Sequence, residues 1–522
     1  MISGRVSFEL TRVFTPLFLD YINGLDILKP FYNRFPSKEL FSAQLAEKSS
    51  GYPVKTRQVL VQVLQRQYSQ LEVAGAVQDN LMALREEKTF TVTTGHQLNI
   101  FTGPLYFIYK IITVINTCKE LKRLHPDYRF VPVFWMASED HDVEEIRSVR
   151  IHGKIYSWET NQKGAVGRFS TQGLAELAGQ IPADVKVFHK AYAGFGRLSD
   201  AVRCYVNDLF GKYGLIVADG DDAELKKLFV PVMQDDIFSN TAYRRVMETD
   251  EILKDRGYKP QVYVRPVNLF YLGDDVRSRI ERLGDNYRVT DTELIFTPDE
   301  LNSLLREHPE KLSPNVILRP LYQECVLPNL AYVGGPAEVA YWLQLKSLFG
   351  HYQIPFPIIM PRNFALLVKQ SLYRKLQKTG LSFEELFIPL QELLNEVALR
   401  HAPDHIRLNG QKAAILNQLE AVRENAKLID PTLSTMVAAE TKRMLKTLEK
   451  IELKMLRAEK RKQADRLRQV TELKEALFPN GGLQERIENF LSFTSGNPEL
   501  IDALIGAFEP FDYRFNICLV ND

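Results

Sequence analysis

Cysteine is scarce in this chain. Only four cysteines occur among 522 residues, and they lie far apart, at Cys118, Cys204, Cys325 and Cys518. The spacing excludes the C-x-x-C zinc and redox motifs and provides no disulfide framework. We therefore expect reduced and mostly buried thiols; a catalytic thiol would also need an activating base, which sequence spacing alone does not identify.

An excess of charge and a long apolar run are also missing. Lys and Arg number 66 against 65 Asp and Glu, which leaves no general positive field to attract nucleic acid or an anionic membrane. The first twenty residues lack the basic-then-apolar order of a secretory signal. No stretch approaches the roughly 20 apolar residues that span a bilayer. We expect a cytoplasmic protein that binds neither nucleic acid nor membranes.

Several common catalytic signatures are absent as well. The chain has neither a G-x-x-x-x-G-K-[ST] phosphate loop nor a G-x-S-x-G nucleophile elbow. His401 and His405 are four residues apart, but Pro403 between them argues against a helical metal-binding pair. An active site must therefore be sought where polar residues follow strands.

Residues 1–370 are typical of an α/β core preceded by helices. The pattern is helical up to about residue 85, most clearly over residues 55–85. A β-branched run at 89–94 is followed by a helical pattern at 104–124 and by a short apolar run at 130–137. This strand–helix–strand order predicts a parallel, Rossmann-like sheet with a ligand crevice at the carboxyl ends of its strands.

The remainder of the core is less regular. Glycines interrupt short runs between about 150 and 210, which indicates an inserted subdomain rather than part of the central sheet. Residues 215–219, 261–272 and 316–318 are further strand candidates, and 338–351 predicts a helix. We expect the α/β core to extend to about residue 370.

Residues 371–522 predict a mainly helical C-terminal domain. Apolar residues recur at alternating three- and four-residue steps from Ile415 to Ile429, and again from Val437 to Ala458. Asp430 and Pro431, between the two series, suit the end of one helix and the first turn of the next. We predict an antiparallel α-helical coiled coil at about 411–477. We also expect a homodimer through it, because a two-helix hairpin leaves an apolar flank uncovered.

Polar residues follow the first predicted strand directly. Gly95 and His96 form half of the H-x-G-H signature of class I aminoacyl-tRNA synthetases, in which the imidazole stabilises charge on nucleotide phosphates. A tight turn with a surface histidine is the alternative interpretation. Thr102 and Gly103 then precede the next helix, where backbone N–H groups suit a phosphate or carboxylate, although an ordinary helix start needs the same residues.

A crowded acidic segment follows the second predicted strand. Glu139, Asp140, His141 and Asp142 place three carboxylates and an imidazole at successive positions. Like charges repel at the mouth of a buried strand, so the cluster favours a cationic ligand. A substrate amine or hydroxyl and a divalent metal are both open interpretations, as is a solvated helix cap.

Two later segments also resemble site loops. Asn315 and Arg319 lie in the sequence SPNVILRP, where the arginine suits a carboxylate or phosphate, with a structural ion pair as the alternative. Gly334 and Gly335 lead into a helix whose first turn carries Glu338. This arrangement suits either close approach of a ligand or a plain turn and cap.

Five segments together resemble the bacillithiol biosynthesis cysteine-adding enzyme family. They are TGHQ (94–97), FTGPLY (101–106), VPVFWMASEDHD (131–142), SPNVxxRP (313–320) and GGPAExAYW (334–342). The resemblance implies a Rossmann-like core related to class I synthetases and a C-terminal coiled coil used for homodimerisation. It also implies addition of L-cysteine to glucosaminyl-malate, the last step of bacillithiol synthesis. A related nucleotidyl transferase acting on another small molecule, and a non-catalytic coiled-coil scaffold, are the alternatives.

The implied reaction requires activation of the cysteine carboxylate, for which ATP is the expected reagent. On this resemblance the catalytic candidates are His96, Asp140 and His141. His96, Thr102 and Gly103 are assigned to nucleotide phosphates, Asp140 and His141 to amine binding or proton transfer, and Arg319 to a malate carboxylate. The other substrate-binding candidates are Gly95, Gln97, Glu139, Asp142, Asn315, Gly334, Gly335 and Glu338. No residue is assigned to a metal, and metal dependence stays open.

Overall fold

The computed structural model describes residues 1–402 and 406–522, in two compact units. The first unit comprises Met1–Leu367 and Gln484–Asp522, and the second comprises Val368–Leu483. The expected boundary near residue 370 agrees with this division, but residues 484–522 belong to the first unit rather than to the helical domain. The reason is that β15 (Arg514–Val520) pairs antiparallel with β1 (Ile2–Ser7).

The core of the first unit is a five-stranded parallel sheet with the order β13-β12-β2-β3-β6. Its strands are β2 (Thr89–His96), β3 (Arg129–Met136), β6 (Ile216–Asp219), β12 (Asn329–Gly334) and β13 (Ile358–Pro361). Counted along the chain and read from β6, the order is 3-2-1-4-5, which is the Rossmann order. The order reverses between β2 and β12, and ligands bind such sheets at this reversal, beyond the carboxyl ends of the strands.

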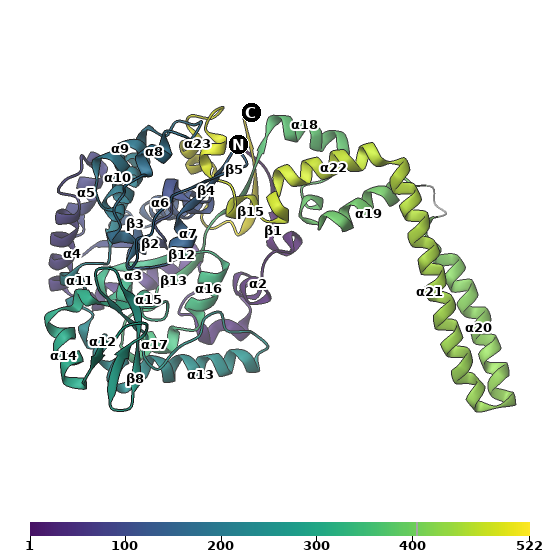
Figure 1. Ribbon diagram of the computed structural model, residues 1–522, viewed down its shortest axis with the longest axis horizontal. Coiled ribbons are helices and arrows are strands. Elements are labelled where there is room, and N and C mark those ends of the chain that lie inside the picture. Colours follow the sequence, from purple (N-terminus) through teal and green to yellow (C-terminus); the bar gives the residue numbers. More distant parts are fainter. Residues whose placement is uncertain (403–405) are drawn as a thin grey trace. The chain divides into compact units, whose positions relative to one another are not determined.

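The predicted strand–helix–strand unit is present. Helix α6 (Tyr106–Leu124) joins β2 to β3, and the sheet lies among helices in Figure 1. All eight residues of β2 are buried, as expected for a central strand covered on both faces. Phe90 and Val92 of β2 pack in one apolar cluster with Val114 of α6 and Phe130 of β3. This cluster fixes β2 and β3 against α6.

The segment expected as an insertion lies between β3 and β6 and adds no strand to the parallel sheet. It contains a hairpin of β4 (Ser148–Ile151) and β5 (Lys154–Ser157). Three helices follow, namely α8 (Leu174–Ala178), α9 (Lys186–Gly194) and α10 (Leu198–Phe210). The N-terminal preface is helical as expected, with α2 (Pro16–Ile22), α3 (Phe41–Gly51), α4 (Val54–Gln67) and α5 (Gly75–Ala83), after the unpredicted strand β1.

Two predicted strands of the core have other structures. Leu269–Leu272 is β7, but it lies in a separate antiparallel sheet of order β10-β9-β8-β7-β11. The other strands there are β8 (Arg277–Leu283), β9 (Asn286–Val289), β10 (Ile295–Phe296) and β11 (Leu312–Pro314). The prediction of a strand at 316–318 is wrong: this segment is a turn before α15 (Arg319–Val326). The Asn315 side-chain oxygen closes the turn by accepting N–H groups from Ile317 and Leu318, at 2.9 and 3.3 Å.

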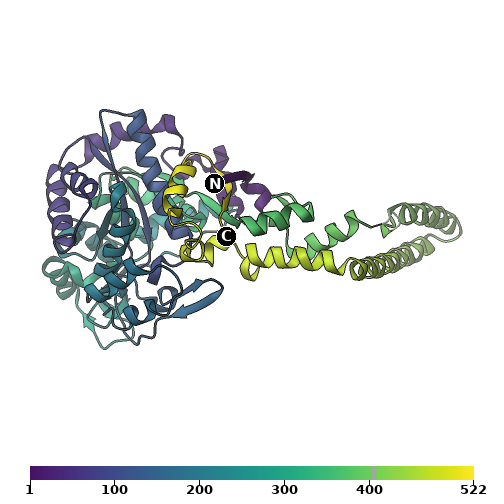
Figure 2. The same ribbon diagram turned by 90° about the horizontal axis from the view of Figure 1, so that it is seen from above.

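The second unit is helical, as predicted. It contains α18 (Gln370–Thr379), α19 (Leu390–Arg400), α20 (Asn409–Ile429), α21 (Pro431–Lys462) and α22 (Ala464–Leu477). Helices α20 and α21 run side by side in opposite directions (Figures 1 and 2). Asp430 caps α21, since its side chain accepts the Thr432 N–H at 2.8 Å. His405 and Pro403, considered above with His401, lie outside the described residues.

Candidate functional site

A cavity of about 380 Å³ opens at the carboxyl ends of the parallel strands, where the strand order reverses. Nine residues expected at a site line it, namely Gly95, His96, Gln97, Glu139, Asp140, Asn315, Arg319, Gly335 and Glu338. The loops after β2 and β3 therefore share one cavity with the start of α16 (Pro336–Leu343), which follows β12. Thr102, Gly103, His141, Asp142 and Gly334 are not among its lining residues.

An ion pair joins α6 to α16 at the reversal point. The Lys110 ammonium lies 2.5 Å from Glu338 Oε2 and donates to the Gly95 carbonyl at 2.9 Å. The same Glu338 carboxylate accepts hydrogen bonds from the Tyr332 hydroxyl (2.6 Å) and the Gly335 N–H (2.8 Å). Burial opposes ionisation of Glu338, but Lys110 and these donors outweigh burial and lower its pKa. Glu338 is therefore an ionised carboxylate whose oxygens are already bound.

Arg319 is a cation of the cavity that has no carboxylate partner within the described residues. Its guanidinium donates to Gln323 Oε1 at 3.2 Å and to the Tyr341 hydroxyl at 3.4 Å, and it lies over the Tyr332 ring at 5.7 Å. None of the ion pairs among residues 1–402 and 406–522 includes it. Space at position 95 is limited, because a Cβ there would lie 3.2 Å from the Tyr332 hydroxyl and 3.6 Å from Arg319 Nη1.

His96 is a buried, neutral imidazole. Burial, with the nearby charge of Lys110, lowers its pKa to about 3. Its Nδ1 lies 3.1 Å from the Gln97 carbonyl oxygen, which only accepts, so the ring proton belongs on Nδ1. Nε2 is then a lone-pair acceptor, and it is buried without a hydrogen-bond partner. The expected role as a cationic phosphate ligand does not suit this state.

Glu139 belongs to a chain of buried charges below the loop after β3. Its carboxylate lies 2.6 Å from the Lys226 ammonium, which also lies 3.2 Å from Asp221. Arg168 pairs with the other side of Asp221 at 2.7 Å. Burial raises the pKa of Glu139 to about 6 against the opposing effect of Lys226. Glu139 thus presents a carboxyl group to the cavity whose pKa lies close to neutral pH.

Asp140 and His141 meet an arginine from the separate antiparallel sheet. Arg277 of β8 donates to His141 Nδ1 at 2.9 Å and lies 3.4 Å from Asp140 Oδ1. Burial opposes ionisation of Asp140, but hydrogen bonding with His141, whose backbone N–H donates to Asp140 Oδ1 at 2.8 Å, and the charge of Arg277 outweigh burial and bring its pKa to about 2. Asp140 is therefore a permanent carboxylate near neutral pH, and His141, which does not line the cavity, contacts the lining residues Asp140 and Arg277.

Other predicted site residues have structural roles. Thr102 is fully buried, and the Asn489 side chain holds the Phe101 and Gly103 carbonyls. Gly103 has φ +61°, and a Cβ there would lie 2.6 Å from the Asn99 Cβ. Three N–H groups before and at the start of α6 donate within the protein, from Gly103 to Ile100, from Leu105 to Glu488 and from Phe107 to Pro104. The predicted phosphate site at Thr102 and Gly103 is thus not formed, because its donors are already used.

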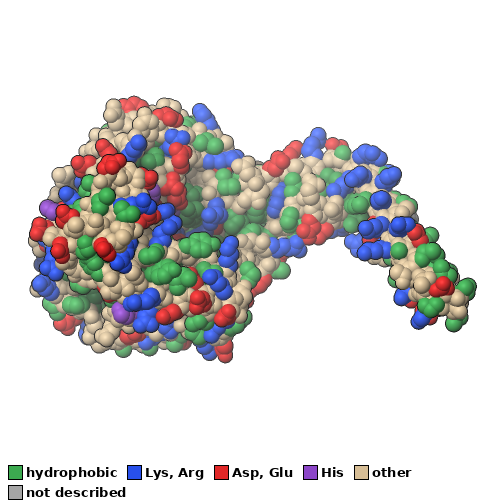
Figure 3. Space-filling model, turned by 60° about the horizontal axis from the view of Figure 1, so that its bottom comes forward, with side chains coloured by type: hydrophobic (Ala, Val, Ile, Leu, Met, Phe, Trp, Pro, Cys, Tyr) green, Lys and Arg blue, Asp and Glu red, His purple; other side chains and the backbone are tan. Residues whose placement is uncertain are grey.

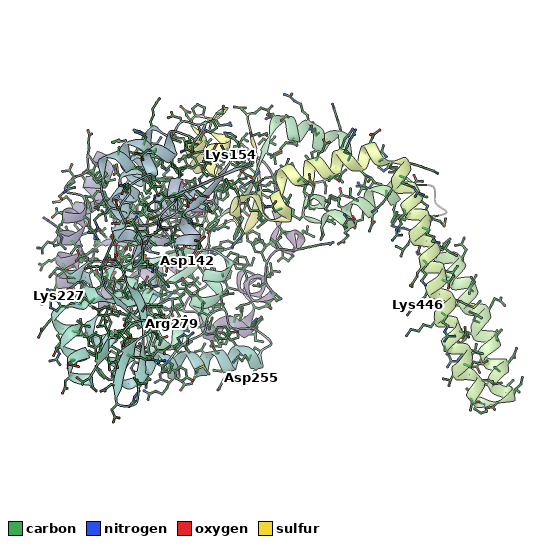
Figure 4. All side chains as sticks on the ribbon, in the orientation of Figure 1. Asp142, Lys154, Lys227, Asp255, Arg279 and Lys446 are labelled. Atoms are coloured by element: carbon green, nitrogen blue, oxygen red, sulfur yellow. The ribbon has the colours of Figure 1, made fainter. Side chains whose placement is uncertain are left out.

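The remaining two candidates lie just outside the cavity. Asp142 caps α7 (Val143–Ile146) by accepting the Glu145 N–H at 3.2 Å, and it is exposed (Figure 4). Gly334 is needed for packing, since a Cβ there would lie 2.8 Å from the Glu338 Cβ. The solvated-cap interpretation therefore holds for Asp142 but not for Glu139 or Asp140.

The sequence analysis missed several cavity residues, namely Tyr106, Lys110, Arg277, Arg362 and Arg486. A single lysine in the apolar run of α6 was a signal for Lys110, since a buried lysine requires a partner. Arg362 follows β13 directly, at the same strand ends as the predicted loops. No comparable signal marks Arg277 or Arg486, which come from the antiparallel sheet and from the segment after the helical unit.

The described part of the chain contains neither a metal-binding cluster nor a membrane-spanning helix. There, no group of three His, Cys, Asp or Glu side chains is arranged to hold a metal ion. None of its helices is long and apolar enough to cross a membrane. The cavity wall contains five cations, of which Lys110, Arg277 and Arg362 pair with protein carboxylates, whereas Arg319 and Arg486 form no ion pair within the described residues and suit a phosphate or carboxylate group.

Two family models cover the chain and divide it close to the boundary between the two units, although the C-terminal model also includes residues 484–520 of the first unit. Residues 1–363 match the family model "Bacillithiol biosynthesis BshC, N-terminal Rossmann-like domain", and residues 365–520 match "Bacillithiol biosynthesis BshC, C-terminal coiled-coil domain". Proteins named "Putative cysteine ligase BshC" from Flavobacterium psychrophilum and Flavobacterium johnsoniae are each 42% identical to this chain, over 98% and 99% of both sequences. A protein of the same name from Christiangramia forsetii is 41% identical over 99% of both. The chain therefore belongs to the bacillithiol biosynthesis BshC family of ligases.

Proposed function

We propose that this protein joins the carboxyl group of L-cysteine to the amine of glucosaminyl-malate, with consumption of ATP, in the cytosol. The observation that carries the proposal is the Arg319 guanidinium, which lines the cavity and forms no ion pair within the described residues. A desolvated cation without a counter-ion favours an anionic ligand. The relatives' printed names supply the cysteine ligase reaction.

The charges of the acceptor match those of the cavity. Glucosaminyl-malate carries two carboxylates and an amine. The cavity has a cationic side, formed by Arg319, Arg362 and Arg486, and an acidic side, formed by Glu139 and Asp140. We place one malate carboxylate on Arg319 and the sugar amine beside Glu139 and Asp140.

The amine must lose a proton before it attacks a carbonyl carbon. Glu139 suits the role of proton acceptor, because burial raises its pKa to about 6, close to the operating pH. Asp140 suits binding of the ammonium form, because its pKa of about 2 makes it a poor base. The two neighbouring carboxyl groups thus have different tasks, and Glu139 replaces Asp140 as the proposed base.

Cysteine must also be activated, since a carboxylate and an amine do not condense in water. We propose ATP as the activating reagent. The neutral His96 would accept a hydrogen bond through Nε2 from an O–H or N–H group of a reactant.

Mass spectrometry of a reaction with purified protein tests the proposal. ATP, L-cysteine and glucosaminyl-malate together should give bacillithiol, and omission of any one should abolish the product. ATP turnover with a different acceptor would favour the nucleotidyl-transferase alternative. A folded protein that forms no product and whose melting temperature none of the three compounds changes would contradict the proposal and favour a scaffold. A strain lacking the gene should accumulate glucosaminyl-malate and lose bacillithiol.

We further propose that the protein is a homodimer through α20 and α21. No residue of α20 is buried, and only Val437 and Glu459 are buried in α21. Apolar side chains reach the surface along these helices among Lys and Arg side chains (Figure 3). The exposed ones are Leu416, Val422, Leu428, Ile429, Met436, Met444, Ile451 and Leu453. Covering such a surface with a second copy would remove it from water.

Sedimentation distinguishes the dimer from its alternatives. Deletion of residues 411–477 should give a monomer, and Met444→Glu should weaken the dimer because it places a charge in the apolar surface. Lys446→Glu is the matched control, since Lys446 projects from α21 on the side away from α20 (Figure 4). A full-length monomer at micromolar concentration would contradict the dimer, and a dimer that survives the deletion would show that the interface lies elsewhere.

A further inference from the structure

Three cations surround one aromatic ring at the edge of the cavity. Tyr106 is the first residue of α6 and lines the cavity. The guanidinium carbons of Arg362 and Arg486 lie 5.3 and 5.7 Å from the centre of its ring, and the Lys110 ammonium lies 5.8 Å from it. Cations repel one another, so their convergence on one side chain requires a compensating negative charge.

Protein carboxylates supply that charge only in part. Glu338 neutralises Lys110, and Glu485 binds both Nη atoms of Arg362, at 3.1 and 2.5 Å. Arg486 forms no ion pair within residues 1–402 and 406–522. One positive charge beside Tyr106 is therefore left without a counter-ion.

Arg362 also has a free donor. Its side chain is only 2% exposed, and its Nε is buried without a hydrogen-bond partner. A buried N–H group without an acceptor is costly, so an acceptor from outside the protein is expected there. Gly335 leaves the approach open, since a Cβ at that position would lie 3.8 Å from Arg362 Nε.

The two guanidinium groups come from segments that are distant in the chain. Arg362 follows β13, and Arg486 belongs to the segment that returns to the first unit after the helical unit. Gln484 fixes this return, because its side chain exchanges two hydrogen bonds with the Leu367 backbone, at 2.9 and 3.0 Å. The adjacent Glu485 orients Arg362. The same short segment thus supplies one cation and positions the other.

We propose that Arg362 Nε and Arg486, which converge beside the Tyr106 ring, form a second carboxylate subsite, so that a dicarboxylate spans the cavity between this subsite and Arg319. The inference rests on the proposed function and specifies its acceptor end: one malate carboxylate binds Arg319, and the other binds here. Lys110 is close to both subsites. Burial lowers the pKa of its ammonium group, and the positive charges of Arg362 and Arg319 lower this pKa further. Each carboxylate would then be bound by guanidinium donors.

Calorimetric titration with L-malate and L-lactate tests the subsite directly, because lactate is malate without one carboxylate. The parent protein should bind malate more tightly than lactate. Arg486→Gln should weaken malate binding by roughly tenfold or more, the effect of losing one charged hydrogen bond, and should leave lactate binding nearly unchanged. Arg319→Gln should weaken both ligands. Arg85→Gln is the control, since Arg85 is an exposed arginine before β2, at the opposite end of the sheet.

Three results would overturn the subsite. They are equal binding of malate and lactate by the parent, unchanged malate binding by Arg486→Gln, and a loss of inorganic phosphate or ATP binding by that variant with malate binding intact. The last result would assign the cations to nucleotide phosphates. Each variant must melt near the parent, which is expected for the exposed Arg486. If the subsite tests fail but the protein makes bacillithiol, the proposed function stands without the subsite. If the protein prefers malate but makes no bacillithiol, the subsite stands without the proposed function.

Discussion

The acidic and cationic sides of the cavity hold their buried cations in different ways. On the acidic side, Lys226 is 1% exposed and contacts two carboxylates, Glu139 at 2.6 Å and Asp221 at 3.2 Å. On the cationic side, Arg319 contacts only neutral groups, the Gln323 amide and the Tyr341 hydroxyl. A cation with protein counter-ions stabilises the fold around a site, whereas one without them is available to a ligand.

This difference gives each side its own measurable property. Removing Lys226 strands buried carboxylates, so the change should appear in the free energy of unfolding. Removing Arg319 strands no charge, so the change should appear in ligand affinity. Removal of one positive charge should therefore lower stability at Lys226 and lower ligand affinity at Arg319.

The largest expected effect is that of Lys226→Met. Loss of one partner of a buried ion pair costs about 3–5 kcal/mol, here because Glu139 and Asp221 lose their shared counter-ion. Urea denaturation measures the change. Lys227→Met is the matched control. The Lys227 side chain is 51% exposed, pairs only with Glu224 and lies at the outer edge of α11 (Ala223–Lys227; Figure 4). This substitution should lower the unfolding free energy by no more than about 0.5 kcal/mol.

A second variant checks the physical cause. Adding Glu139→Gln to Lys226→Met removes one of the stranded carboxylates, so the double variant should regain part of the lost stability. An unfolding free energy for Lys226→Met within about 1 kcal/mol of the parent would show that the acidic side is not held by this ion pair.

The acidic side was partly predictable and the cationic side largely was not. Glu139 and Asp140 were found because both follow a short apolar run, and the carboxyl end of a parallel strand is a fixed place in the fold. Lys226 and Arg168, which hold Glu139 and Asp221, lie outside any motif. Glu139 is buried and paired with Lys226, whereas Asp142 is an exposed helix cap. The four adjacent residues of the sequence do not reveal this difference.

Side-chain hydrogen bonds account for the errors of the sequence analysis. Apolar residues at 316–318 suggested a strand, but Asn315 bonds to the following N–H groups and turns the chain, which places Arg319 at the start of α15. Thr102 and Gly103 suggested a phosphate site, but the Asn489 side chain donates hydrogen bonds to the Phe101 and Gly103 carbonyls and fixes that loop. Asn489 and Arg486 come from a segment that follows the helical unit, so their position depends on tertiary contacts alone.

Arg319→Gln should show the next largest effect. Loss of a charged hydrogen bond weakens binding by about 1.5–3 kcal/mol, so the KM for glucosaminyl-malate should rise roughly 10- to 150-fold. The unfolding free energy should change by no more than about 1 kcal/mol, because no ion pair is broken. A variant that loses stability as Lys226→Met does, with an unchanged KM, would remove the distinction between the two sides.

The smallest expected effect concerns His96, which ends β2 between the two sides. Its folded-state pKa of about 3 is far below the 6.5 of an unfolded histidine, because burial and Lys110 disfavour the imidazolium form. Below about pH 6.5 the unfolded chain therefore takes up a proton that the folded protein does not bind until about pH 3. Stability must fall as the pH falls, and His96 should account for about 2 kcal/mol of that loss at pH 5.

His96→Gln tests whether this part of the cavity is held neutral. The variant should lose about 2 kcal/mol less than the parent between pH 7 and pH 5, as measured by urea denaturation at both values. His189→Gln, which changes an exposed histidine, should follow the parent. An identical pH dependence in His96→Gln and the parent would mean that His96 is protonated in the folded protein. The imidazolium would then add a positive charge between the two sides. Its Nε2 would also carry a proton and could not act as the proposed hydrogen-bond acceptor.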